Sequence, residues 1–321
     1  MRGWTPMGLP VSAVICTHNQ AQWLGEAIES LVDQTLAKDA YEIIVVDNAS
    51  SDSTRTVVGK FLDRDNFHYI FEPRIGLSYA RNTGWQSAKG QIIAYIDSDA
   101  VASSDWLEKM LQCYQNISPT PICVGGRILP LWDAPRPKWL SKSMEPYVGI
   151  IDWSEGAGTI EEKGPYLAGS NVSYQRWILN HQQGFNPALG RKGRILLSNE
   201  EILLQYRIRA QGYHIWYDPQ ILVMHHVKKS CLTINWFYKR YYWQGISDII
   251  LDFQMQARPT GTKNLLPYLV TDIWGLLRAT GHLFRRASVE PRRHVLHKCL
   301  MLQFLGRIRA NIMMNIRGKP I

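Results

Sequence analysis

The stretch QIIAYIDSDA, residues 91–100, decides the fold class of this chain. Its first six residues are mostly apolar and β-prone, which is typical of a strand buried on both faces of a parallel sheet. Asp97 and Asp99 follow at once, so we expect them at the carboxyl end of that strand, the edge where open α/β sheets bind ligands. Two carboxylates repel a diphosphate, but a divalent cation held between them would attract one. A solvated turn is the alternative interpretation, because Asp and Ser favour turns.

Strands and helices are expected to alternate around this stretch. We expect strands at residues 11–16, 41–46, 68–71, 213–217 and 221–224, and helices at 21–34, 54–62 and 76–88. In the first hundred residues this alternation predicts a doubly wound α/β sheet. No GxGxxG follows the first strand and the chain has no GxxxxGK[ST], which disfavours dinucleotide and P-loop enzymes.

Length and cysteine content indicate the size of the domains and the compartment of the protein. A chain of 321 residues can bury a substantial core and could form one large domain or two. Its five cysteines show no CxxC spacing and no even framework, which predicts a reduced, cytosolic compartment. The N-terminus lacks the apolar core of a signal peptide, and no uncharged apolar run is long enough to cross a bilayer.

The net charge of +9 is unevenly distributed along the chain. Residues 228–321 carry sixteen Lys and Arg against four Asp and Glu, whereas residues 1–227 carry twenty against twenty-three. The basic character therefore belongs to the last third. Such asymmetry predicts a region that meets an anionic surface, either nucleic acid or lipid.

Seven sequence blocks, in this order, resemble family-2 glycosyltransferases with the GT-A fold. They are VSAVICTHNQ, EIIVVDNASSD, GLSYARNTG, AYIDSDA, YLAGSNVSYQR, GFNPALGRKGRILLSNEEILLQYRIRAQGY and WYDPQILVMHH. The resemblance implies a GT-A catalytic domain over residues 1–230, a doubly wound mixed sheet flanked by helices. Its nucleotide-binding half would cover about 9–127 and its acceptor half about 128–230, followed by a basic, mainly helical region over 231–321.

The resemblance implies a donor site at the strand ends. Thr17 and Asp47 match residues that hold the base and ribose of a nucleotide sugar, and Arg81 matches a donor-binding arginine. An ordinary surface arginine is the alternative for Arg81. Gly169 and Asn171 belong to a G-x-N segment beside the donor diphosphate, where the glycine permits close approach and the amide offers both donor and acceptor groups.

The resemblance also implies a metal site for Mg²⁺ or Mn²⁺. Asp99 matches the direct metal ligand, and Asp97 matches the member of the DxD motif that contacts both ribose and metal. His225 matches a histidine that joins them, and a neutral imidazole is a suitable ligand for Mn²⁺. A histidine that caps the sheet is the alternative for His225.

The segment SNEEILLQYR, residues 198–207, matches the catalytic-base block of the family. Its Glu-Glu-x-x-Leu-x-x-Arg stands where the family has Glu-Asp-x-x-Leu-x-x-Arg, so Glu201 is the expected base and Glu200 the reserve candidate. The chain departs from the family by one methylene at Glu201 and by Asn199, where Gly is commoner. Two glutamates in the first turn of a helix are also explained by the helix dipole alone.

The last third resembles the family least. We expect helices at residues 236–253, 265–286 and 300–315, the last two with apolar stripes that Asp272, Arg278, Arg307 and Arg309 keep from spanning a bilayer. Basic amphipathic helices predict a peripheral protein on the anionic, cytoplasmic face of the cell membrane. The alternative is that the stripes pack on the catalytic domain or form the interface of a homodimer.

The resemblance implies an inverting transfer of a sugar from a nucleoside-diphosphate sugar, expected to be a UDP-sugar, to a glycan or lipid-linked acceptor in polysaccharide or cell-envelope biosynthesis. Glu201 would take the proton of the acceptor hydroxyl while the metal neutralises the leaving diphosphate. One rival is a sugar-phosphate nucleotidyltransferase, which would release pyrophosphate. A basic nucleic-acid-binding protein is the other, but it leaves the seven blocks unexplained, so we expect no nucleic-acid partner.

Overall fold

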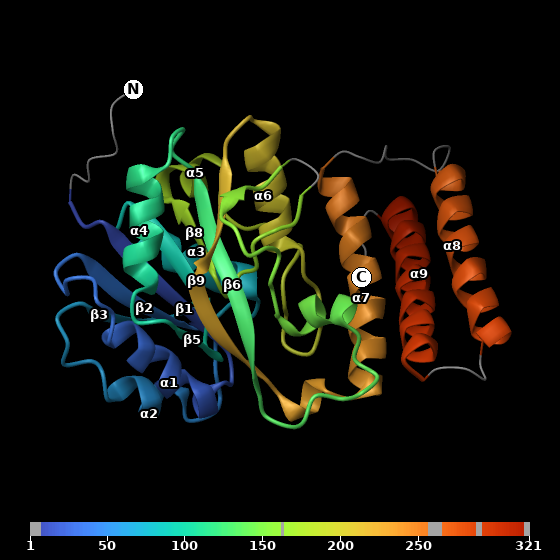
Figure 1. Ribbon diagram of the computed structural model, residues 1–321, viewed down its shortest axis with the longest axis horizontal. Coiled ribbons are helices and arrows are strands. Elements are labelled where there is room, and N and C mark those ends of the chain that lie inside the picture. The colour runs from blue at the N-terminus through green and yellow to red at the C-terminus, as the bar shows by residue number, and fades with distance from the viewer. Residues whose placement is uncertain (1–7, 162–163, 256–264, 287–290, 318–321) are drawn as a thin grey trace. The chain divides into compact units, whose positions relative to one another are not determined.

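The computed structural model describes residues 8–161, 164–255, 265–286 and 291–317 (Figure 1). The chain divides into two compact units. The first comprises Met1–Leu131, Gly149–Pro187 and Glu200–His226, and the second comprises Trp132–Val148, Ala188–Asn199 and Val227–Ile321. The last segment of the second unit begins close to the expected boundary at residue 230, but two loops from the middle of the chain also belong to that unit.

A single mixed sheet forms the centre of the first unit. Its strands are β1 (Val11–Thr17), β2 (Tyr41–Asp47), β3 (Phe67–Phe71), β4 (Ile92–Asp97), β5 (Ala100–Ala102), β6 (Cys123–Trp132), β7 (Gly158–Thr159), β8 (Val172–Gln175) and β9 (Ile215–Val227). The order among the described residues is β3-β2-β1-β4-β8-β6-β9-β5, with β7 paired to β9. Strand β1 is parallel to β2 and β4, and β2 is parallel to β3, whereas β8 is antiparallel to β4 and β6.

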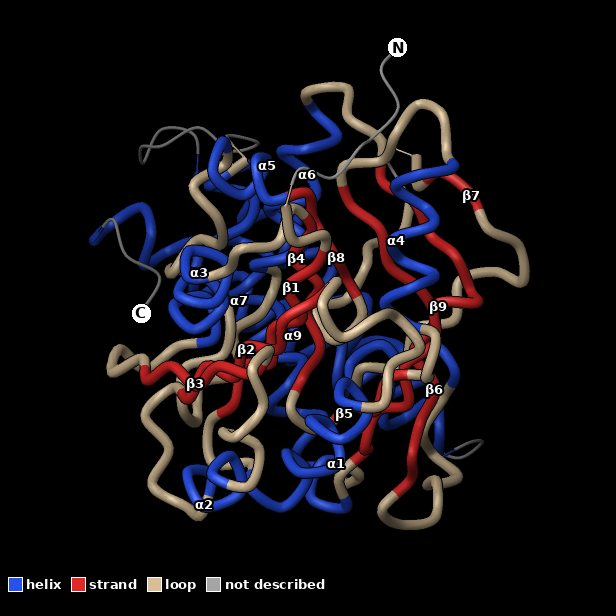
Figure 2. The backbone as a smooth tube through the Cα atoms, turned by 90° about the vertical axis from the view of Figure 1, so that its left-hand side faces the viewer, coloured by secondary structure: helices blue, strands red, loops and turns tan. Residues whose placement is uncertain are grey.

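Helices cover both faces of this sheet. On one face lie α1 (Ala21–Val32), α2 (Thr54–Gly59) and α4 (Trp106–Asn116), and on the other lie α3 (Leu77–Ser87), α5 (Arg176–His181) and α6 (Glu200–Ala210). Figure 2 shows α1 and α2 on one side of β1, β2 and β3, and α3 on the other. Alternate residues of each parallel strand enter opposite cores, as Ile15 and Cys16 do in β1. Burial on both faces accounts for the near-continuous apolar runs that predicted these strands.

The register of the parallel strands brings their polar ends together. Thr17 lies opposite Asp47, and Cys16 lies opposite Asp97. The carboxyl ends of β1, β2 and β4 therefore share one edge of the sheet, the edge at which open α/β sheets place their ligands.

The structure differs from the sequence expectation at β9, and it adds strands β5, β7 and β8, which were not expected. Strand β9 runs unbroken over Ile215–Val227, where the sequence predicted two short strands separated at Asp218-Pro219. The Asp218 carboxylate accepts the backbone N–H of Gln220, and the strand continues through this irregularity. The three-residue strand β5 was not predicted, because it follows the DxD motif directly and is too short to show a pattern.

Among its described residues, the second unit contains two short 3₁₀ helices, Lys142–Val148 and Lys229–Cys231, and three long helices, α7 (Ile234–Gln254), α8 (Leu265–Arg286) and α9 (Pro291–Arg317). Helix α9 lies between α7 and α8 (Figure 1). Gly245 and Gly306 let α7 and α9 approach closely, since a Cβ at either position would overlap the backbone of the other helix. Helix α9 starts earlier than expected because Pro291 suits the first position of a helix. No helix in the described ranges is long and apolar enough to cross a membrane.

Candidate active site

The two aspartates of the DxD motif and His225 form one cluster. Asp97 ends β4, Asp99 lies in the turn before β5, and His225 lies opposite Ala100 in the antiparallel pair of β5 and β9. The His225 Nε2 is 3.4 Å from Asp99 Oδ1, and one possible ligand atom from each of the three residues lies within 4.8 Å of the others. The structure therefore brings together the three residues that the sequence predicts as metal ligands.

The chemistry of this cluster fits a divalent cation. Two carboxylates and an imidazole are a donor set that suits Mn²⁺, and carboxylates are also the usual ligands of Mg²⁺. Burial raises the pKa of Asp97, the charge of Asp99 raises it further, and the cation of Arg81 opposes both effects. A cation at this position would relieve the repulsion between the two carboxylates.

Gly149, which lies against the His225 imidazole, was not recognised from the sequence. Gly149 has a φ of 82°, and a Cβ at this position would lie 3.0 Å from His225 Cε1. Any side chain there would be strained and would push on the imidazole. Gly149 belongs to an irregular stretch, in which neither the left-handed conformation nor the distant histidine leaves a signal in the sequence.

Arg81 links the DxD motif to helix α6. Its side chain is 3% exposed, which contradicts the interpretation as a surface arginine. Nη1 lies 2.6 Å from Glu200 Oε1, Nη2 lies 3.6 Å from Asp97 Oδ1, and the guanidinium lies over the Phe185 ring. Although burial opposes its charge, the carboxylates of Glu200 and Asp97 raise the pKa of Arg81. The residue is thus a fixed cation between the predicted metal site and the predicted base.

The two glutamates of α6 have different surroundings. Glu200 is buried and forms the short ion pair with Arg81. Burial and the charge of Glu200 raise the pKa of Glu201 to about 8, with an opposing effect from Arg81. Glu201 is therefore a carboxyl group whose raised pKa makes it a better proton acceptor than an ordinary glutamate, a property that suits a general base. This difference supports the choice of Glu201 over the reserve candidate.

The residue before α6 explains one departure from the family pattern. Asn199 has a φ of 76°, in the left-handed region that glycine adopts most easily and asparagine tolerates better than most residues. Its side-chain amide donates to Asp248 Oδ1 at 3.1 Å, and its carbonyl oxygen accepts from Gln244 at 2.9 Å. Asn199 therefore keeps the backbone conformation that glycine would supply and adds a hydrogen-bonded side chain.

Thr17 and Asp47 lie side by side at the carboxyl ends of β1 and β2. Both are almost completely buried, and Thr17 Oγ1 has no hydrogen-bond partner among the described residues. Asp47 accepts the backbone N–H of Ser50 and the hydroxyl of Tyr69, each at 2.9 Å. Burial and the bond to Asp47 raise the pKa of Tyr69. A buried hydroxyl without a partner, beside a carboxylate, offers hydrogen bonds to a ligand.

The structure gives Gly169 another role than the one expected. We expected this glycine to permit close approach of the donor. A Cβ at residue 169 would instead overlap the guanidinium of Arg81, so the glycine makes room for that side chain. Its effect on donor binding would then act through Arg81.

The expectation for the Asn171 side chain is wrong. Asn171 is fully buried, and its amide N–H groups donate to the backbone carbonyls of Arg127 and Ile221 at 2.9 and 2.8 Å. Its carbonyl oxygen accepts from the indole of Trp106 at 2.8 Å. Both N–H groups are used within the fold, so Asn171 connects strands and has none left for a nucleotide sugar.

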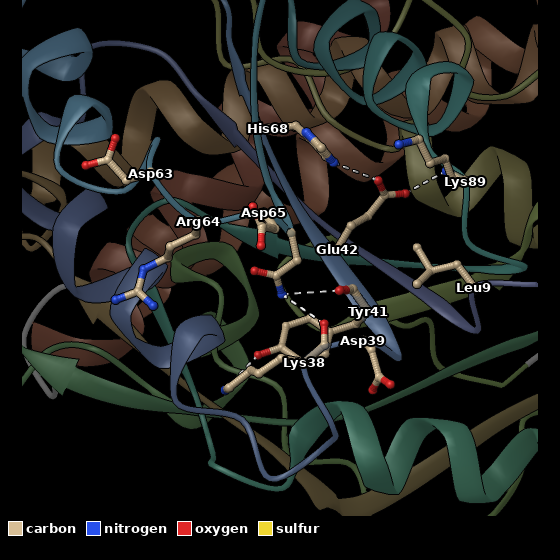
Figure 3. A pocket seen from close by; sticks show the side chains of 11 residues that line it. Leu9, Lys38, Asp39, Tyr41, Glu42, Asp63, Arg64, Asp65, His68 and Lys89 are labelled. Carbon is tan, nitrogen blue, oxygen red and sulfur yellow. Dashed lines mark hydrogen bonds and ion pairs between the residues drawn. The ribbon is translucent and has the colours of Figure 1, made fainter.

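A hollow of about 640 Å³ lies elsewhere in the first unit, at the amino end of β2 (Figure 3). Its most buried acid is Glu42, which accepts from Ser12 Oγ and from the backbone N–H of Lys89, both at 2.6 Å. The His68 Nε2 lies 3.2 Å from the same carboxylate. These contacts occupy Glu42 and explain its burial without a ligand, and the strand ends with the DxD motif are at the opposite edge.

Comparison with known proteins agrees with this geometry. The model of glycosyl transferase family 2 matches residues 12–181. A glucosyl-dolichyl phosphate glucuronosyltransferase of Haloferax volcanii is 30% identical over 249 residues, 76% of this chain and 78% of that protein. A poly(ribitol-phosphate) beta-glucosyltransferase of Bacillus spizizenii is 29% identical over 45% of this chain and 23% of its own length.

Solved structures show the same fold. A mannosyltransferase from Pyrobaculum calidifontis, in complex with GDP-Man and Mn²⁺, superposes with a TM-score of 0.62 at 18% identity, covering 97% of this chain and 88% of that one. TarS of S. aureus, in complex with UDP-GlcNAc, superposes with a TM-score of 0.53 at 17% identity, covering 77% of this chain and 72% of that one. The chain therefore belongs to glycosyltransferase family 2 and has the GT-A fold.

Proposed function

We propose that this glycosyltransferase moves a sugar, with inversion, from a nucleoside-diphosphate sugar to a glycan or lipid-linked acceptor, and that it requires Mg²⁺ or Mn²⁺. The observation that carries the proposal is one connected set of charged groups. It runs from the cluster of Asp97, Asp99 and His225 through Arg81 to Glu200 and Glu201. The set combines a cation site for a diphosphate with a titratable carboxyl group for an acceptor hydroxyl.

Each group has a role in a single displacement. A cation held by Asp97, Asp99 and His225 would supply positive charge to the leaving diphosphate. Glu201 accepts the proton of the acceptor hydroxyl as that oxygen forms a bond to the anomeric carbon. The bond from that carbon to the diphosphate oxygen breaks on the opposite face, so the configuration inverts. Arg81 holds Glu200 and adds a fixed cation beside Asp97.

The donor and acceptor classes rest on the chemistry of relatives. The two solved structures hold GDP-Man with Mn²⁺ and UDP-GlcNAc, which supports a nucleotide-sugar donor and a metal. We keep a UDP-sugar as the proposed donor, with Thr17 and Asp47 at its base and ribose. The names of relatives include a dolichyl phosphate and a poly(ribitol phosphate), which supports a lipid-linked or envelope-glycan acceptor.

The charge distribution supports a place of action at a membrane surface. Residues 228–321 carry sixteen basic against four acidic side chains, which suits an anionic membrane surface. We propose a peripheral enzyme on the cytoplasmic face of the membrane, where it would meet a lipid-linked acceptor in two dimensions.

The reaction products test this proposal. The full-length protein is incubated with Mn²⁺, a panel of UDP- and GDP-sugars, and polyprenyl phosphate or its glucosylated form as acceptor. We expect a nucleoside diphosphate and a new glycoside of inverted configuration, both detected by NMR, and no product after addition of EDTA. Release of pyrophosphate would instead support a nucleotidyltransferase, and a retained configuration would refute the displacement.

A further inference from the structure

Helix α8 exposes its apolar side. Val270, Ile273, Trp274 and Leu277 are 55%, 44%, 60% and 62% exposed. Their spacing of three and four residues places them in one stripe along the helix. A surface helix of a globular domain normally turns such a stripe towards the core. The orientation of α8 is therefore the reverse of the usual one.

The side of α8 that faces α9 carries small residues and an aspartate. Asp272 is 1% exposed and Ala279 is 5% exposed. Gly275 contacts Phe304 of α9 so closely that a Cβ at residue 275 would overlap the ring. Helix α8 thus packs on α9 through an aspartate and two small residues, whereas Val270, Ile273, Trp274 and Leu277 face outward.

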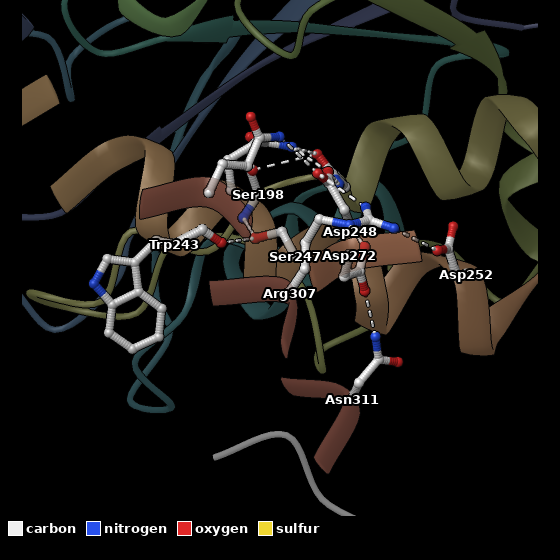
Figure 4. A network of polar contacts seen from close by, with 11 residues as sticks. Ser198, Trp243, Ser247, Asp248, Asp252, Asp272, Arg307 and Asn311 are labelled. Atoms are coloured by element: carbon white, nitrogen blue, oxygen red, sulfur yellow. Dashed lines mark hydrogen bonds and ion pairs between the residues drawn. The ribbon is translucent and has the colours of Figure 1, made fainter. Parts of the chain in front are cut away.

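Buried polar bonds fix this orientation. Asp272 accepts from Arg307 Nε and from the Asn311 amide, both at 2.7 Å (Figure 4). The guanidinium of Arg307 also lies 3.6 Å from Asp248 and 3.7 Å from Asp252. Rotation of α8 to bury its apolar stripe would separate Asp272 from both partners. The buried Asp272 carboxylate would lose its hydrogen bonds, and the charge of Arg307 would be less compensated. Breaking a buried ion pair in this way is strongly unfavourable. The exposed stripe is therefore a built feature of the second unit.

We propose that the α8 stripe, defined as Val270, Ile273, Trp274 and Leu277, is the face that inserts into the surface of an anionic bilayer. The guanidinium of Arg278 lies 5.1 Å from the centre of the Trp274 ring. An aromatic ring beside a cation suits the level of the headgroups, with the apolar side chains below it. The inference gives the membrane partner of the proposed function a specific contact surface.

The net positive charge of residues 228–321 favours an anionic lipid surface, rather than a second copy of this chain, as the partner of the α8 stripe. Residues 228–321 have sixteen basic and four acidic side chains, so two such regions repel each other while an anionic leaflet attracts them. The structure also narrows the expectation that both C-terminal stripes meet the membrane. Arg307 and Asn311 of α9 point to Asp272 within the unit. Leu305, Ile312 and Ile316 of α9 are 39%, 37% and 70% exposed, but the α8 stripe contains a tryptophan with an arginine beside it, so the lipid face is assigned to α8.

Vesicle flotation tests the assignment. The full-length protein is mixed with vesicles of phosphatidylcholine and phosphatidylglycerol, or of phosphatidylcholine alone, at low and high salt. We expect flotation with the anionic vesicles at low salt and at least a tenfold loss of binding in the double variant W274Q/L277Q. The matched control is Trp177→Gln, which removes another exposed tryptophan, 46% exposed, from α5 in the first unit and should float like the wild type.

A conservative variant keeps the test valid if the double variant fails to fold. Trp274→Phe should still float, but brominated lipids should quench its remaining fluorescence less than they quench the wild type. The proposal is overturned if the wild type does not float with anionic vesicles, if W274Q/L277Q floats equally well, or if sedimentation shows that the double variant dissociates a dimer.

Failure of this inference can be separated from failure of the proposed function. Nucleotide binding in the presence of Mn²⁺ is measured by calorimetry on the same W274Q/L277Q protein. Loss of flotation with unchanged nucleotide binding supports the lipid face alone. Flotation of a protein that binds no nucleotide would preserve the α8 assignment and refute the donor site.

Discussion

The two adjacent glutamates at the start of α6 have identical side chains but different surroundings. Glu200 forms an ion pair with Arg81 at 2.6 Å, whereas burial and the charge of Glu200 raise the pKa of Glu201 to about 8. We predict that Glu201→Gln lowers turnover by about a hundredfold or more, the usual scale for loss of a general base, with little change in donor affinity. Steady-state kinetics and calorimetry measure the two effects. Wild-type turnover in Glu201→Gln, with turnover lost only in Glu200→Gln, would shift the assignment by one residue.

The raised pKa of Glu201 predicts a pH dependence. Below about pH 8 the carboxyl group is mostly protonated and cannot accept the acceptor's proton, so turnover should rise with pH through this value. Glu200→Gln removes a like charge, so it should lower the pKa of Glu201 and move the rising limb to lower pH. The measurement is turnover at saturating donor between about pH 6 and pH 9.5. An unchanged midpoint in Glu200→Gln would show that Glu201 does not control the profile.

Gly169 offers a test of the buried arginine. A Cβ at this position overlaps the Arg81 guanidinium, so Gly169→Ala must displace a side chain that holds both Glu200 and Asp97. We expect at least a tenfold loss of turnover and a lower melting temperature, because displaced buried charges lose their partners. The control is Gly156→Ala, where no atom lies within 4 Å of the added Cβ. Equal activity of the two variants would contradict the role given to Arg81.

The sequence predicted part of this residue-level account. Asp97, Asp99 and His225 come together as expected because Asp97 ends β4, Asp99 precedes β5, and His225 lies on β9, which pairs with β5. Asn171 could not be assigned correctly, since its three hydrogen-bond partners come from separate parts of the chain. An amide that offers both donors and acceptors serves a ligand and a fold equally well, and only the three-dimensional contacts distinguish them.

At the scale of elements, the start of α6 depends on one left-handed residue. Asn199 combines a φ of 76° with hydrogen bonds to Asp248 and Gln244. Asn199→Ala loses these bonds and strains the backbone, whereas Asn199→Gly loses the bonds only. We predict that the glycine variant is more stable than the alanine variant by about 1–2 kcal/mol, the cost of the left-handed conformation. Urea unfolding followed by circular dichroism measures the difference, and equal stability would contradict the stated backbone strain.

The orientation of α8 shows what an element's sequence pattern leaves undetermined. The pattern predicted a helix over residues 265–286 with an apolar stripe, and the helix is there. The direction of the stripe depends on Asp272, whose partners Arg307 and Asn311 lie on another helix. Because those contacts are distant in sequence, periodicity alone could not distinguish an apolar side turned to the core from one turned outward.

At the scale of the whole molecule, the parallel half of the sheet was the most predictable part. Strands β1, β2 and β4 are fully or almost fully buried, so their sequences carry long apolar runs. The sequence did not predict that residues 132–148 and 188–199 belong to the second unit, because these loops have no comparable apolar pattern. These loops owe their place to tertiary contacts, such as the stacking of Tyr147 on Tyr241, that no local pattern encodes.

The most direct test of the account is calorimetry of UDP and GDP binding with Mn²⁺, with EDTA, and in Asp99→Ala. If Asp97, Asp99 and His225 hold the cation that receives the diphosphate, the wild type binds one nucleotide with Mn²⁺, and binding is lost with EDTA and in the folded variant. His225→Ala should weaken this binding, whereas His226→Ala, whose imidazole pairs with Glu26 at 3.0 Å, should not. Equal affinity with and without EDTA, or unchanged affinity in Asp99→Ala, would contradict the account.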